Sequence, residues 1–160
     1  MCAVGIFPTA QRHKDGTMHA NELVGELGAK LGISLALSES GTCRVSFDSD
    51  DVDFEQSGDS LYIMAEIASA AGREDAYARL LAANWLGAES GGACIGLDAE
   101  RNAFALYTVE HGDVPYEDFE ARLTLFIRAL RYWKEWLAQP AVSAPASPVG
   151  ESFSAGMIRI

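Results

Sequence analysis

The segment from Tyr77 to Tyr107, YARLLAANWLGAESGGACIGLDAERNAFALY, places an almost wholly apolar helical pattern directly before two short strand patterns. The helix is predicted over about Arg73–Leu86, and Gly87 is a typical C-terminal stop. After the first turn only Arg79 and Asn84 are polar. Because one sheet cannot cover so wide an apolar surface, the segment predicts a protein partner rather than a small substrate.

Five strands are predicted where apolar residues alternate with polar ones or form short runs between turns. They cover Cys43–Phe47, Val52–Glu55, Leu61–Ala68, Gly92–Asp98 and Ala103–Glu110. The first two are expected to form a hairpin with one solvent-facing side, joined by a turn at Asp48–Asp51. The third is apolar on both faces, so it is expected to be a central strand.

Two further helices flank these strands. A first helix is predicted over residues 19–33, where leucines recur four residues apart on one face. A last helix is predicted to open with Asp113 as N-cap and Pro115 in its first turn, and to end at Gln139–Pro140. Its apolar stripe recurs at steps of three and four residues and consists of Tyr116, Phe119, Leu123, Phe126, Leu130, Trp133 and Leu137.

The order of these elements predicts one α+β domain over residues 18–138, arranged α-β-β-β-α-β-β-α. With 160 residues, of which 49% are hydrophobic, the chain suffices for one core but not for two. Residues 1–17 are interpreted as a flexible N-terminal extension, and the Pro/Ala/Ser-rich residues 139–160 as a tail. The tail ends in GMIRI, a short apolar sequence that could dock in a groove or add to a sheet edge.

The formal net charge of −11 excludes some classes of ligand. A nucleic-acid backbone and an anionic membrane would both be repelled by this surface, so neither is expected as a partner. The three cysteines, Cys2, Cys43 and Cys94, form no CxxC pair, which predicts neither a disulfide framework nor a zinc site. No segment approaches the roughly 20 apolar residues of a membrane span, so a cytoplasmic protein is expected.

The residues that carry chemistry occur singly. Cys2 loosely matches the N-terminal nucleophile of some amidotransferases, but an N-terminal extension explains it better. The acidic run Asp48–Glu55 lacks the glycine and glutamate of a calcium loop, so a solvated hairpin turn is favoured. No serine or cysteine lies in a nucleophile motif, and the glycines at 91, 92 and 96 form no phosphate-binding loop. We therefore expect no enzyme activity, cofactor or metal.

Several segments in this order resemble the type III secretion chaperones of the Tir chaperone (CesT-like) family, class I. Leu27–Phe47, LGAKLGISLALSESGTCRVSF, resembles the opening helix and first strand of that family. Leu80–Asn84, together with Gly91–Ala93 and Ile95–Asp98, resembles the most recognisable part of the family, and Phe119–Leu137 resembles its closing helix. The resemblance covers about residues 18–138.

The resemblance implies a small acidic homodimer in the bacterial cytoplasm, with a five-stranded antiparallel sheet and three helices. Such a protein binds the N-terminal segment of a secreted effector and keeps it soluble and competent for export without ATP. The secretion ATPase is a candidate further partner. The alternative is a small non-enzymatic regulatory or adaptor domain that binds a folded protein, with the GMIRI tail as its recognition element.

Two sets of site residues follow as hypotheses. The dimer interface is assigned to Tyr77, Leu80, Leu81, Asn84 and Trp85, with Asn84 as the polar residue inside the seam and the fourth strand nearby. An apolar groove for an extended effector segment is assigned to Leu23, Leu27, Leu31, Val45, Phe47 and Phe54. The competing interpretation of the second set is that these side chains face the core of the protein itself.

Overall fold

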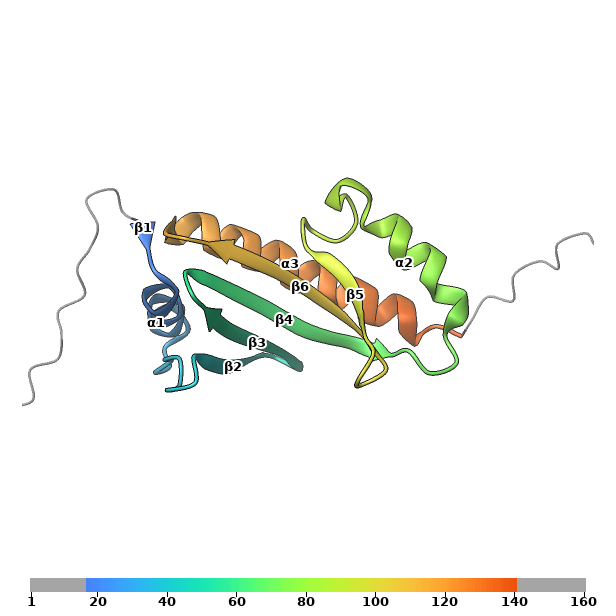
Figure 1. Cartoon of the computed structure of the whole chain (residues 1–160), viewed down its shortest axis with the longest axis horizontal. Coiled ribbons are helices and arrows are strands. Elements are labelled where there is room, and N and C mark those ends of the chain that lie inside the picture. Colours follow the sequence, from blue (N-terminus) through green and yellow to red (C-terminus); the bar gives the residue numbers. More distant parts are fainter. Residues whose placement is uncertain (1–16, 141–160) are drawn as a thin grey trace, which may run out of the picture.

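The computed structural model describes residues 17–140, which form a twisted sheet with helices on one side (Figure 1). Five antiparallel strands lie in the order β2-β3-β4-β6-β5. They cover Thr42–Phe47 (β2), Asp50–Ser57 (β3), Ser60–Ser69 (β4), Cys94–Asp98 (β5) and Ala103–His111 (β6). The predicted α+β class and five-stranded sheet are confirmed, and β4 is central as its two apolar faces predicted.

Three helices complete the predicted order: α1 (Ala20–Leu31), α2 (Tyr77–Ala83) and α3 (Tyr116–Ala138). The long helix α3 lies along one face of the sheet (Figure 1) and contacts β4 and β6. All seven residues of its predicted apolar stripe are buried, and Trp133 is fully enclosed. Burying each such side chain contributes roughly 1.5–3 kcal/mol, so this stripe is the main reason that the helix forms where it does.

Two local predictions are wrong. Helix α3 begins at Tyr116 with Pro115 as its N-cap, because Val114–Pro115 (β7) pairs with Thr17–Met18 (β1) in a separate two-stranded sheet. Asp113 therefore lies before this pairing instead of capping the helix. The predicted helix over residues 73–86 is divided into a 3₁₀ turn at Glu74–Ala76, the short α2, and a second 3₁₀ turn at Trp85–Gly87.

The core lies between α3 and the face of the sheet that is turned toward it. Along β4 the alternate residues Leu61, Ile63 and Ala65 are buried on this face. Their neighbours Tyr62 and Met64 lie on the opposite face, which we call the outer face of the sheet. No helix within residues 17–140 combines the length and apolarity that crossing a bilayer requires.

Candidate functional site

Four large apolar side chains lie exposed where α2 approaches the edge strand β5. Leu81 is 70% exposed, Trp85 75% and Leu86 87%, and Leu97 on β5 is 48% exposed. We call these four residues the α2–β5 face. Monomeric proteins seldom expose clustered side chains of this size, and such clusters are typical of protein–protein interfaces.

Backbone geometry after α2 explains how this face arises. Leu86 adopts the left-handed conformation, with φ 56° and ψ 17°, and interrupts the helical backbone between Trp85 and Gly87. Its side chain is consequently exposed, although a continuous helix was predicted through this residue. Leu86 and Leu97 were both missed by the sequence analysis. The sequence pattern did not reveal the exposure of Leu97, because Leu97 lies on the same strand face as Ile95, which is buried.

The five residues assigned to the dimer interface separate into two groups. Leu81 and Trp85 belong to the exposed α2–β5 face. Tyr77 and Leu80 point inward, since Leu80 is buried and the Tyr77 ring packs edge-on against Phe104 at 5.4 Å between centroids. The interior pair holds α2 in place so that the other two side chains face outward.

Asn84, the fifth residue, binds the backbone of β5. Its side-chain Nδ2 donates to the carbonyl oxygen of Ile95 at 2.9 Å, and its Oδ1 accepts from the Ile95 N–H at 2.8 Å. The amide thus takes the place of a neighbouring strand at this position. Edge strands expose unpaired N–H and C=O groups that recruit further strands, and Asn84 satisfies one such pair on β5.

The other edge of the sheet, β2, has the opposite character. In the β2–β3 hairpin Phe47 pairs with Asp50 across a two-residue loop, so Phe47 and Val45 exchange hydrogen bonds with β3. The alternating residues Arg44 and Ser46 therefore direct their backbone N–H and C=O groups toward the open side. These four groups can accept an added strand.

Apolar side chains lie exposed along the connection that leads into β2. Leu31 at the end of α1 is 44% exposed and Ile33 is 50% exposed. Leu35 is held against α1, because Gly28 leaves room for it: a Cβ at position 28 would lie 2.8 Å from the Leu35 Cβ. We call Leu31, Ile33 and the open side of β2 the β2 edge surface.

Most residues assigned to the effector groove lie in the core of the protomer instead. Leu23, Leu27, Val45 and Phe54 are each at most 4% exposed, as the competing interpretation stated. Phe47 is half-buried and packs against the same core. Only Leu31 of this set is exposed, so the open surface lies beside the predicted groove residues rather than on them.

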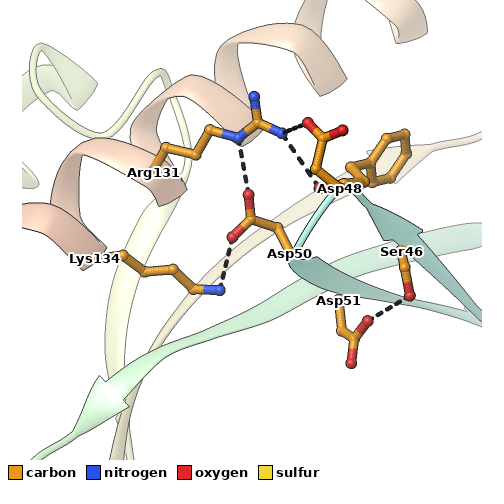
Figure 2. A network of polar contacts seen from close by, with 7 residues as sticks. Ser46, Asp48, Asp50, Asp51, Arg131 and Lys134 are labelled. Carbon is orange, nitrogen blue, oxygen red and sulfur yellow. Dashed lines mark hydrogen bonds and ion pairs between the residues drawn. The ribbon is translucent and has the colours of Figure 1, made fainter.

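A buried carboxylate fixes the hairpin that carries β2 (Figure 2). Asp50 is 4% exposed and accepts hydrogen bonds at 2.8 Å from Arg131 Nε and from Lys134 Nζ, both on α3. Arg131 also donates to the Asp48 carboxylate at 2.7 Å and to the Phe47 carbonyl at 3.2 Å. The β2–β3 turn is thereby joined to α3 by charged hydrogen bonds.

The environment of Asp50 lowers its pKa. Burial alone would raise this pKa, but the hydrogen bonds from Lys134 and Arg131 favour the charged carboxylate and outweigh that effect. The prediction of a solvated acidic turn is therefore only partly right, because Asp48 and Asp51 are exposed whereas Asp50 is an internal anchor.

Within residues 17–140, no group of three or more His, Cys, Asp or Glu side chains is arranged to hold a metal ion.

Comparison with known proteins relates this arrangement to a family. The model of the Tir chaperone protein (CesT) family matches residues 22–134, which is most of the chain. No curated protein matches the sequence.

Similar solved structures share the fold at low sequence identity. The ExsC–ExsE complex contains a chain of TM-score 0.63 and 23% identity, matched over 73% of this chain and 92% of that chain. In the HopA1–SchA chaperone–effector complex the matched chain has a TM-score of 0.62 and 16% identity, over 71% of this chain and 91% of that chain. The Yersinia pestis type III secretion chaperone SycH, in complex with a fragment of YscM2, has a TM-score of 0.54 and 18% identity, over 71% of this chain and 98% of that chain. With the family match and the fold in agreement, this chain belongs to the Tir chaperone (CesT) family and is an effector-binding chaperone of type III secretion.

Proposed function

We propose that the protein is a homodimer of the bacterial cytoplasm that binds an extended N-terminal segment of a secreted effector at the β2 edge surface. The bound segment is kept soluble and competent for export without ATP. The observation that carries this proposal is the difference between the two sheet edges. Asn84 occupies part of the β5 edge, whereas the β2 edge is open and lies beside exposed apolar side chains.

Strand addition explains how such a surface could hold many different side chains. Main-chain hydrogen bonds to Arg44 and Ser46 would supply affinity that does not depend on the client sequence. Apolar contacts with Leu31 and Ile33 would then select clients that place large apolar residues near one end of the added strand. Binding of this kind breaks no covalent bond, and the family consists of non-enzymatic chaperones, so we propose that the protein has no catalytic activity.

Dimerisation is proposed through the α2–β5 face. Its four exposed side chains include one tryptophan and three leucines, and a second copy of the same face would cover them. The β2 and β5 edges lie at opposite ends of the strand order. A dimer formed at the β5 side would therefore leave both β2 edges open to a client.

Two matched variants test the assignment of the two surfaces. Leu81→Asp and Ile33→Asp each place a charge where an exposed apolar side chain stood, one on each surface. Leu81→Asp is expected to give a monomer in equilibrium sedimentation at micromolar concentration. Ile33→Asp is expected to remain a dimer and to bind an effector N-terminal segment at least tenfold more weakly in calorimetry.

Each variant is the control for the other. A wild-type protein that sediments as a stable monomer at micromolar concentration would contradict the dimer. If Ile33→Asp leaves client affinity unchanged while Leu81→Asp abolishes it in a folded protein, the client binds the α2–β5 face instead.

A further inference from the structure

The outer face of the sheet carries an apolar strip on its central strands. Tyr62 is 36% exposed and Met64 is half-buried on β4, and Tyr107, which pairs with Met64 on β6, is 42% exposed. A groove of about 510 Å³ lies over this face, with Met64, Ala103 and Ala105 among the residues that line it. The alanines leave space for a short peptide or a few side chains to approach the sheet closely.

The charges around this groove are only partly balanced. Arg44 is paired with Asp53 at 2.6 Å, and Arg101 with Asp98 at 3.7 Å. Glu66, which lies on the same face two residues after Met64, is exposed and forms no ion pair within residues 17–140. Glu55, which pairs with Tyr62 on the same face, also lines the groove and forms no ion pair within residues 17–140. The groove therefore combines an apolar strip with two uncompensated carboxylates, and it fits a short apolar segment that carries a cation. Of the two, only Glu66 also lines the hollow near the end of α3.

Residues 157–160, Met-Ile-Arg-Ile, have this composition. Met157, Ile158 and Ile160 are apolar, and Arg159 is the only cation in residues 139–160. Alternation in an extended backbone would place Met157 and Arg159 on one side and the isoleucines on the other. One side could thus contact the apolar strip and Glu66 together.

The point at which the chain leaves the described structure places this segment within reach. Arg73, just after β4, donates to the Leu137 carbonyl and so fixes the end of α3 beside the end of the sheet. Near that end a second hollow, of about 310 Å³, is lined by Lys134, Ile67 and Glu66. A flexible chain with as many residues as 141–156 has an average end-to-end distance of about 22 Å. The same chain fully extended would reach about 50 Å. Such a tether gives an effective concentration in the millimolar range.

We propose that residues 156–160 bind back, within the same molecule, to the outer face of the sheet, with Arg159 paired to Glu66. The segment covers the apolar strip that α3 leaves open on the far side of the sheet. This contact uses the outer face of the sheet, whereas the client is proposed to bind at the β2 edge surface and the second copy at the α2–β5 face. It also gives the GMIRI sequence a role that does not require a separate folded partner.

A peptide added in trans tests the contact. A fluorescent peptide of residues 152–160 is expected to bind a chain that lacks residues 156–160, as measured by anisotropy. The full chain is expected to bind the same peptide at least tenfold more weakly, because its own tail occupies the groove at high effective concentration. Equal binding to both chains, or binding to neither, would overturn the proposal.

Charge exchange tests the site. In the shortened chain, Glu66→Arg is expected to weaken peptide binding at least fivefold, and a peptide with Arg159→Glu is expected to restore it. Glu39→Arg, an exposed change in the connection leading to β2, is the control and should leave binding unchanged. Loss of binding in Glu39→Arg but not in Glu66→Arg would place the tail on the β2 edge surface and overturn the assignment. Unchanged circular dichroism confirms that each variant is folded.

Discussion

Single polar residues decide the local structure at both edges of the sheet. Asn84 satisfies the β5 backbone, and Asp50 joins the β2–β3 turn to α3. Neither role was predicted, since each depends on a partner in another element of the folded chain. The partners of Asp50 are Arg131 and Lys134, which lie more than eighty residues later in the sequence.

Replacing Asp50 by Asn tests its role as an anchor. The variant should lower the free energy of unfolding at pH 7 by about 1–3 kcal/mol, because two charged hydrogen bonds lose their carboxylate. The pKa of Asp50 is lowered in the folded protein, so its contribution is complete above the unfolded pKa near 3.9 and disappears as the pH falls through the lower, folded value. Urea unfolding from pH 7 down to pH 3 should show the wild type and variant converging. A difference that is constant with pH would contradict this.

Position 91 requires glycine for two reasons, its backbone conformation and its close packing against α3. Its φ is +65°, and a Cβ at this position would lie 2.7 Å from the carbonyl oxygen of Leu125 on α3. Gly91→Ala should therefore destabilise the protein by roughly 3 kcal/mol, from backbone strain and overpacking together. Gly58→Ala is the matched control, because Gly58 also has a positive φ but open space around it, and roughly 1 kcal/mol is expected. Equal losses in urea unfolding would show that packing at Gly91 is unimportant.

At the scale of elements, long periodic segments were predicted well and short ones poorly. Helix α3 and the strands β2 to β6 lie where their apolar patterns placed them, within a few residues. The helix after β4 is shorter than its composition indicated, because Asn84 turns to β5 and Leu86 leaves the helical conformation. Apolar composition alone could not show that interruption.

The open edge of β2 leads to a prediction about its backbone. Ser46→Pro removes an N–H that points away from β3, so the hairpin should remain paired. Client binding should nevertheless fall at least tenfold, because one main-chain hydrogen bond is lost and the proline ring obstructs the edge. Ser46→Ala is the control, since both variants lose the hydroxyl that donates to Asp51 at 2.6 Å. Calorimetry with an effector N-terminal segment measures the difference. Equal affinities for the two variants would mean that the client does not pair with β2.

At the scale of the whole molecule, the described structure is one folded unit with two apolar surfaces at opposite sheet edges. Its helices lie on one side of the sheet (Figure 1), so the outer face and the β2 edge are available for binding, whereas Asn84 occupies part of the β5 edge. The predicted domain boundary at residues 18–138 is still a prediction, and the predicted N-terminal extension and tail lie largely outside the described residues 17–140.

The domain boundary can be tested by truncation. A chain of residues 17–140 should fold cooperatively, sediment as a dimer and retain client affinity within about threefold, because the core, the α2–β5 face and the β2 edge surface are complete within it. Circular dichroism, sedimentation and calorimetry provide the three measurements. Loss of the dimer on truncation would show that the removed residues belong to the interface.

The sequence by itself determined the class of fold, the central strand β4, the buried stripe of α3 and the family, because each is encoded by periodicity or by local segments in a fixed order. Only the tertiary structure decided which apolar residues are exposed. Leu23, Val45 and Phe54 are buried whereas Ile33 and Leu86 are exposed, although all five have wholly apolar side chains. The physical reason is that exposure depends on what packs above a residue, and that is set by contacts between elements, such as α1 and α3 against the sheet, that form only in the folded chain.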